Sequence, residues 1–153
     1  MSPRAGLVAI LLCLGGCAST PAVAERFEDR PGAITVGADR LERSETGDTL
    51  VLLFSGKVVV QQAKSILHAD RVKVFIDMRH DTIVRSISTG NVRLRAGDCL
   101  VVSAERVVYY GPEEQLALGL NASITVKGET VVTREPVLIE LATIPWAMRR
   151  CAD

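Results

Sequence analysis

The chain has 153 residues; 48% of them are hydrophobic and 4% aromatic, and 18 Lys and Arg residues balance 18 Asp and Glu residues. A chain of this length is expected to form one domain with a sizeable core. Its net charge near zero, without a basic run, argues against a nucleic-acid partner, and its apolar content excludes a disordered chain. Because Val, Leu, Ile and Ala supply most of that content, the composition favours strands.

The first predicted element is a targeting segment at residues 1–16. It combines a short positive region that contains Arg4 with the apolar stretch Ala5–Gly16, which is too short for a permanent transmembrane helix. We therefore predict an exported protein with a signal peptide at residues 1–16, followed by a tether at residues 17–33.

Two cleavage sites compete after the apolar stretch. Leu14–Cys17 resembles a bacterial lipobox, in which Cys17 would be acylated and would become the new N-terminus, whereas Ala22–Ala24 fits ordinary signal peptidase. Acylation would anchor the protein, since each buried methylene contributes about 0.8 kcal/mol. Ala18 after the cysteine would favour the outer membrane. In the alternative, Cys17 is only an apolar residue of the signal peptide.

Two cysteines, Cys99 and Cys151, remain in the exported part of the chain. An oxidising compartment would permit a disulfide between them, and a buried thiol at Cys99 is the alternative. Two cysteines so far apart, with no nearby pair of histidines, do not make a zinc site.

From residue 34 onward the apolar residues alternate or form short runs, and no stretch has helical periodicity. The pattern predicts an all-β, antiparallel domain over residues 34–142, with a C-terminal tail at residues 143–153. Turn-forming residues separate the strands at Thr46–Asp48, Asp77–Asp81, Ala96–Asp98, Gly111–Glu113 and Lys127–Glu129.

One short motif, Ala-acid-Arg, occurs at Ala38, Ala69 and Ala104. The copies lie about 31 and 35 residues apart, a spacing typical of repeated structural units. Short strands that open on a small residue alternate with them. We predict that each Ala-acid-Arg lies on the same strand of successive two-strand units of one folded sheet. The glycines at Gly56 and Gly90 would mark the passage between layers.

Three stretches resemble the organic-solvent-tolerance (OstA-like, LptA-like) domain of the lipopolysaccharide-transport family: Ser55–Phe75, Ile87–Tyr110 and Leu116–Val132. They share a small-Asn-Val/Ala opening, then Ala-acid-Arg, then a strand that ends in Tyr or Phe. A final apolar strand follows at Val137–Leu141, so the resemblance covers about Ile34–Leu141. Lys57 replaces the usual Asn, Leu120 stands where Gly is commoner, and a lipobox is not typical of the family's periplasmic bridge protein.

The resemblance implies an antiparallel β-jellyroll of two splayed sheets, open at both ends, with an apolar groove for acyl chains. The scarcity of aromatic residues agrees with this, because large aromatics usually fill the centre of a closed sandwich. Alternating positions predict the residues that line the groove: Val58, Val60, Val72, Val74, Ile76, Ile87, Val92, Leu94, Leu118, Ile124, Val126, Ile139 and Leu141.

The implied function is a periplasmic lipopolysaccharide-binding component that shields the acyl chains of lipid A and carries lipopolysaccharide toward the outer membrane. Terminal strands near Ile34–Leu41 and Val137–Leu141 would be free to pair edge-on with other jellyroll proteins of the transport bridge, or head to tail with a second copy. An alternative is a lipid-anchored scaffold protein of the cell envelope that docks other proteins without lipid cargo.

The two histidines, His68 and His80, belong to no catalytic motif. His68 precedes Asp70 by two positions on a predicted strand, and we interpret it as an ordinary strand residue. We therefore predict a non-enzyme without a cofactor or metal. A diverged enzyme module that uses His68 or Asp70 is the remaining alternative.

Overall fold

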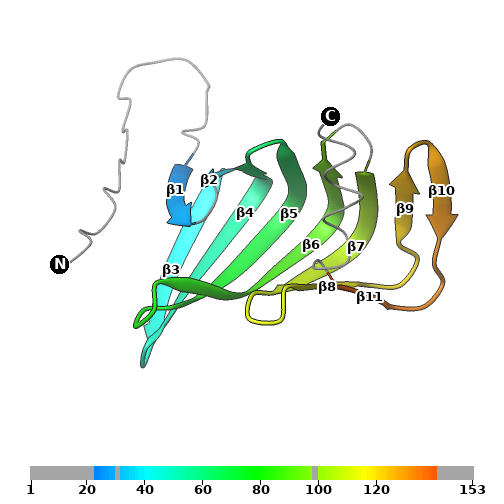
Figure 1. Cartoon of the computed structure of the whole chain (residues 1–153). Coiled ribbons are helices and arrows are strands. Elements are labelled where there is room, and N and C mark those ends of the chain that lie inside the picture. The colour runs from blue at the N-terminus through cyan, green and yellow to red at the C-terminus, as the bar shows by residue number, and fades with distance from the viewer. Residues whose placement is uncertain (1–22, 30–31, 98–99, 141–153) are drawn as a thin grey trace, which may run out of the picture.

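The computed structural model describes residues 23–29, 32–97 and 100–140, with side chains from residue 34 onward. Within these ranges the protein is all-β and antiparallel, as predicted, with strands joined in one 11-stranded sheet. The described residues include no helix, and hence none that could cross a membrane. Figure 1 shows that the sheet folds into two layers and stays open.

The strands are β1 (Val23–Asp29), β2 (Gly32–Ala38), β3 (Arg40–Thr46), β4 (Thr49–Gln62), β5 (Ser65–Asp77), β6 (Thr82–Ala96), β7 (Leu100–Tyr110), β8 (Gln115–Leu118), β9 (Ser123–Val126), β10 (Glu129–Val132) and β11 (Val137–Glu140). Strands β4 to β7 are the longest, with 14, 13, 15 and 11 residues, and each runs through both layers.

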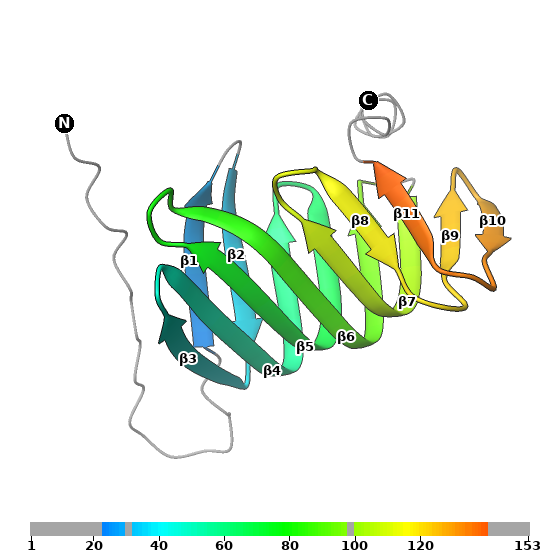
Figure 2. The ribbon, with the colours of Figure 1, turned by 90° about the horizontal axis from the view of Figure 1, so that it is seen from below.

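Short strands complete each layer beside these long ones. The layer drawn upper in Figure 1 has β1 and β2 at one end and β9 and β10 at the other, and the lower layer has β3 at one end and β8 and β11 at the other. Figure 2, seen from below, shows the strands of the lower layer running obliquely across those of the upper layer. The arrangement is the jellyroll of two splayed sheets that the sequence predicted.

A line of bends, here called the crease, separates the two layers. Along it the pairing of β4 with β5 shifts between Ser55 and Val58, and the pairing of β6 with β7 shifts between Thr89 and Val92. Such bulges insert unpaired residues and bend the strand. The glycines predicted to mark the passage between layers, Gly56 and Gly90, lie in these two bulges with φ of 79° and 77°.

Two of the three Ala-acid-Arg motifs, those at Ala38 and Ala69, supply the acidic side chain that lies against a glycine in these bends. A Cβ atom added at Gly56 would lie 2.6 Å from Oδ2 of Asp39, and one added at Gly90 would lie 2.8 Å from Cβ of Asp70. The glycine of one strand therefore makes room for the acidic side chain of its neighbour. The repeat recurs because every second strand crosses the crease in the same direction.

The alanines of the motif face the interior of the fold. Ala38, Ala69 and Ala104 are 4%, 5% and 9% exposed, and Ala122 takes the equivalent place beside β9 with no exposure. Small side chains let the two layers approach closely where the sheet folds. The core lies between the two layers beside the crease. Its largest fully buried side chains are Phe54, Leu52, Leu118, Val36, Val58, Val92 and Val102.

The N-terminal end of the sheet differs from the prediction. Strand β1 and the start of β2 lie inside residues 17–33, where we predicted a tether. Residues Ile34–Gly37 pair on one side with β1 and on the other with β4, so they do not form the predicted edge. The pairing of β1 uses backbone groups, and the sequence VAERFED has no clear alternation that would have revealed a strand.

Several predictions concern residues outside the described ranges. These are the signal peptide at residues 1–16, the acylation of Cys17, the disulfide between Cys99 and Cys151, the groove residue Leu141 and the tail at residues 143–153. They stay predictions.

Candidate functional site

The inner face of the folded sheet, meaning the side chains that point between the two layers, is the candidate site. Antiparallel partners share a face of the sheet, so the register assigns each side chain to one side. In the lower layer the inner row nearest the crease contains Leu41, Phe54, Val72, Ser88, Val107 and Leu118. The next row contains Arg43, Leu52, Val74, Ser86, Tyr109, Leu116 and Ile139.

The upper layer contributes a continuous aliphatic row. It runs through Val36, Val60, Leu67, Leu94, Val102, Ile124 and Val131, each paired with the next across neighbouring strands. Val36 and Val102 are buried, Val60, Leu67, Leu94 and Ile124 are partly buried and pack against the core, and Val131, at the end of the layer, is 62% exposed. The inner face of the upper layer therefore becomes more open toward β10.

Most of the predicted groove residues lie on this inner face. Val58, Val72, Val74, Ile76, Val92 and Leu118 are buried in the core, and Val60, Leu94, Ile124 and Ile139 pack against it while partly exposed. Val126 pairs with the inward-facing Leu100 and is 36% exposed.

Ile87 is the exception, because the structure places it on the outer face. It lies opposite Lys73 on β5 and Val108 on β7. The pairing of β5 with β6 shifts between Phe75 and Ile76, so Val84 is an extra residue in β6. One extra residue reverses the alternation, and the simple alternation from which Ile87 was predicted therefore fails.

Several inner residues were absent from the predicted groove, and four of them are instructive. Leu52 and Phe54 are fully buried, and the apolar run Leu50–Phe54 just before Gly56 was a signal that could have identified them. Ser86 and Ser88 also face inward, opposite Val74 and Val72. No sequence signal marks these two serines as interior residues, because their orientation depends on the bulge.

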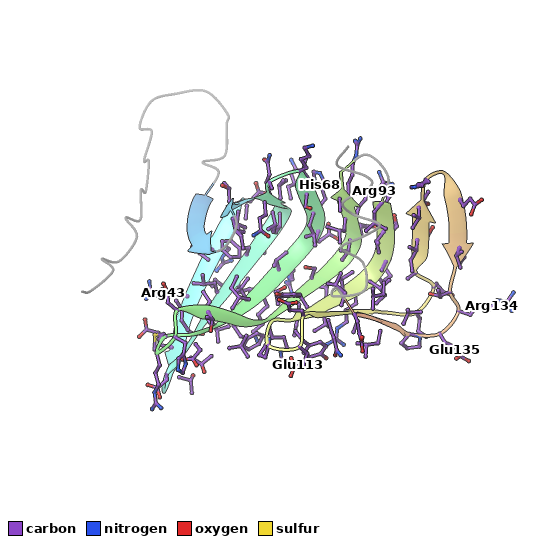
Figure 3. The ribbon with its side chains drawn as sticks, in the orientation of Figure 1. Arg43, His68, Arg93, Glu113, Arg134 and Glu135 are labelled. Carbon is purple, nitrogen blue, oxygen red and sulfur yellow. The ribbon has the colours of Figure 1, made fainter. Side chains whose placement is uncertain are left out.

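Charged residues lie at the ends of the sheet. Arg43 and Glu45 of β3 occupy inward positions, and their side chains pair at 2.7 Å between Nη2 and Oε1. Figure 3 shows Arg43 at one end of the molecule, and Arg134 and Glu135 at the other. Inward charges on an edge strand disfavour indiscriminate pairing with other sheets.

Four described strands have one unpaired side. Strands β1 and β10 end the upper layer, and β3 and β11 end the lower layer. Unpaired backbone N–H and C=O groups at such edges can accept another strand. Both layers thus offer an edge at each end of the sheet.

A hollow of about 790 Å³ lies on the outer face beside the crease, and its walls include His68, Arg93, Asn91, Glu105 and Leu120. His68 and Arg93 stand opposite each other on the upper layer (Figure 3). These exposed side chains form no pairing of a nucleophile with a base. Within the described ranges no group of three or more His, Cys, Asp and Glu residues could hold a metal ion.

The second histidine has a structural contact in the turn between β5 and β6. His80 Nδ1 lies 2.7 Å from Asp77 Oδ2, and the backbone N–H of Arg79 donates to Asp77 Oδ1 at 2.8 Å. The hydrogen bond with His80, followed by the one from Arg79, lowers the pKa of the exposed Asp77 from its ordinary value of 3.8. These contacts order the turn and do not reach the inner face.

Comparison with known proteins agrees with the geometry. A family model described as "LptA/(LptD N-terminal domain) LPS transport protein" matches residues 35–139. The crystal structure of LptH from Pseudomonas aeruginosa, the LptA homologous periplasmic component of that organism's lipopolysaccharide transport device, shares the fold. Its TM-score is 0.59 at 21% identity, over 73% of this chain and 78% of that chain. No curated protein matches the sequence.

The matched family consists of transport proteins and not of enzymes, which confirms the prediction of a non-enzyme. The match spans most of the described strands, from β2 to β11. This chain belongs to the LptA/(LptD N-terminal domain) family of lipopolysaccharide transport proteins.

Proposed function

We propose that this protein is a periplasmic component of lipopolysaccharide transport whose inner face shields the acyl chains of lipid A on their way to the outer membrane. The observation that carries this proposal is the aliphatic inner face of an open sheet in a member of this family. Phe54 is the only aromatic residue among its fully buried side chains in the described part of the chain.

The partly exposed inner residues are the ones that acyl chains would contact first. Val60, Leu94, Ile124 and Ile139 pack against the core and still present apolar surface. Each methylene that moves from water onto such a surface contributes about 0.8 kcal/mol. This attraction has no preferred direction, so a chain can slide along the face when another lipid pushes from upstream, without a local energy source.

The edge strands support docking of other jellyroll proteins. A second sheet that pairs with β1 and β3, or with β10 and β11, would extend both layers at once. Head-to-tail association of two copies is one form of this docking. The inward charges Arg43 and Glu45 on β3 would restrict which edges fit there, because an unmatched partner would bury them without a counter-charge.

Export and anchoring complete the proposal. Strand β1 begins at Val23, so cleavage after Ala24 would remove the first two residues of that strand. Cleavage before Cys17 would leave β1 whole, which favours the acylated form. Intact-mass spectrometry of the mature protein distinguishes the two N-termini, and the same measurement without reducing agent reports whether Cys99 and Cys151 are bridged.

The test uses a chain that starts at residue 18, so that it lacks Cys17 and keeps every described strand. It is secreted into a Gram-negative periplasm and purified without detergent. Mass spectrometry of the extracted lipid is expected to find lipid A at near-stoichiometric levels. Val60→Asp places a charge on the inner face and is expected to abolish this lipid. Val59→Asp is the matched control, because Val59 is equally half-buried but faces outward, opposite the exposed His68.

Thermal unfolding of both variants shows whether they are folded. A folded wild-type protein that carries no lipid and takes up no added lipopolysaccharide would overturn the proposal. The scaffold alternative, docking through the edges without cargo, would then take its place.

A further inference from the structure

Strand β6, in the middle of the lower layer, carries two small hydroxyl side chains on the inner face. At the two inner positions nearest the crease, strands β4, β5 and β8 carry Leu, Phe or Val, whereas β6 carries Ser88 and Ser86. The bulge at Val84 turns these two serines inward and turns Ile87 outward. Strand β6 thus places two hydroxyl groups beside Val72, Val74 and Val107, and Ser86 also lies opposite Tyr109 on β7.

The Ser88 side chain is deeply buried. It is 3% exposed, and it lies between Val72 of β5 and Val107 of β7, which are also 3% exposed. Among the described residues neither Ser88 nor Ser86 forms a side-chain hydrogen bond. Ser86 is one inner row farther from the crease and is more exposed. Ser86 therefore lies in the more accessible part of the inner face, and Ser88 lies in its buried part.

An unpaired hydroxyl in such surroundings is unfavourable. A buried polar group without a partner destabilises the fold, because it loses its hydrogen bonds to water and gains none in return. Alanine at the same positions would avoid this loss and would still fit. The two serines are thus explained if a ligand that enters between the layers supplies the missing partner.

We propose that Ser86 and Ser88 form a subsite that hydrogen-bonds an oxygen atom on a bound acyl chain, either a hydroxyl or an ester oxygen. This inference rests on the proposed function and deepens it, since it names the chemistry that the inner face selects. A serine hydroxyl can donate to a carbonyl and can accept from a hydroxyl, so both kinds of oxygen fit. The aliphatic neighbours Val72, Val74 and Val107 hold the hydrocarbon on either side.

The consequence is selectivity between acyl chains of equal length. A chain with an oxygen near its carboxyl end satisfies the serines, whereas a plain saturated chain leaves them unpaired. Neutral hydrogen bonds in proteins are worth about 1 kcal/mol net, which corresponds to about a fivefold difference in affinity.

The experiment compares two probes, myristic acid and 3-hydroxymyristic acid, which have the same chain length. Lipid is first removed from the mature protein, and binding is measured by isothermal titration calorimetry. Wild-type protein is expected to bind the hydroxy acid about fivefold more tightly. Ser88→Ala is expected to abolish the preference without weakening myristic acid binding, and Ser86→Ala to reduce it. Ser103→Ala is the matched control, since Ser103 lies on the outer face opposite Arg93.

The outcomes separate this inference from the proposed function. Equal affinity of wild-type protein for the two acids, or an unchanged preference in Ser88→Ala, would overturn the subsite while leaving lipid binding intact. Failure to bind either acid, together with the absence of copurified lipid, would overturn both proposals. Ser88→Ala removes no hydrogen bond among the described residues, so its melting temperature is expected to equal or exceed that of the wild type.

Discussion

Strands β5 and β6 are neighbours along most of their length, and both cross the crease, yet they do so with different residues. Strand β5 bends at Ala69 and Asp70, whereas β6 bends at Gly90 and Asn91, whose φ angles are 77° and 48°. The bends interlock, because Asn91 Nδ2 donates to Asp70 Oδ2 at 3.2 Å. Strand β5 supplies the Asp70 side chain that fills the bend, and β6 supplies the backbone conformation at Gly90 and Asn91 that leaves room for it.

The same two strands also differ on their inner faces. Strand β5 presents Val72, Val74 and Ile76, which are all buried, whereas β6 presents Ser86 and Ser88. Packing of the lower layer therefore depends more on β5, whereas β6 supplies two small hydroxyl side chains. The difference teaches that paired strands with similar backbones can divide structural and binding roles between them.

The largest expected effect is at the bend of β6. Gly90→Ala is expected to lower the free energy of unfolding by about 3 kcal/mol or more, because an L-residue is strained at this φ and its Cβ would collide with Asp70. Gly128→Ala is the control, with a φ of 86° and nothing within 4 Å of the added Cβ. Gly128→Ala is expected to lower the free energy of unfolding by about 1–2 kcal/mol. Chemical denaturation measures the free energy of unfolding of both variants. Equal losses would show that the close contact between Gly90 and Asp70 of β5 contributes nothing to stability.

The next effect contrasts the two inner faces. Val74→Ala, at a site that is 5% exposed, is expected to destabilise the protein by about 2 kcal/mol through two lost methyl groups and the space they leave. Ser86→Ala, directly opposite on β6, is expected to change stability by less than about 0.5 kcal/mol. Urea unfolding of both variants measures this. Similar losses would contradict the division of roles between the strands.

A smaller effect is expected at Asn91, which makes the side-chain contact across the crease. Asn91→Ala is expected to cost about 1–2 kcal/mol, since alanine is less stable at positive φ and cannot bond Asp70. Asn91→Gly keeps the backbone conformation and loses only the hydrogen bond, so its cost is expected to be about 0.5 kcal/mol. If the two variants are equally stable, the conformation of Asn91 does not matter.

The smallest effect concerns the turn that joins β5 to β6. Contacts with His80 and Arg79 lower the pKa of Asp77 below 3.8, so the stability they contribute is present above that pH and is lost as the pH falls through the lowered pKa. The melting temperature of Asp77→Asn is thus expected to lie slightly below that of the wild type at pH 5, and the gap is expected to close near pH 2. Glu113→Gln, in the exposed turn after β7, controls for the loss of one carboxylate; a gap that persisted at low pH would contradict this account.

Much of the fold could be predicted from local signals. Alternating apolar residues and turn residues encode antiparallel strands, and the spacing of Ala38, Ala69 and Ala104 encodes the repeated crossing of the crease. The same alternation identified inner residues such as Val58, Val72 and Val92 correctly, because those strands are regular between their bulges. The apolar run that contains Phe54 was equally visible but was not used.

Sequence alone thus determined the all-β class, the repeat and the family resemblance, since each depends on residues close together in the chain or on their regular spacing. Tertiary structure decided which face of β6 lines the interior and where the sheet ends. A bulge adds one residue, reverses the alternation beyond it, and depends on how β6 pairs with β5, not on the residues of β6 alone. For that reason Ile87 faces outward, and Ser86 and Ser88 face the interior.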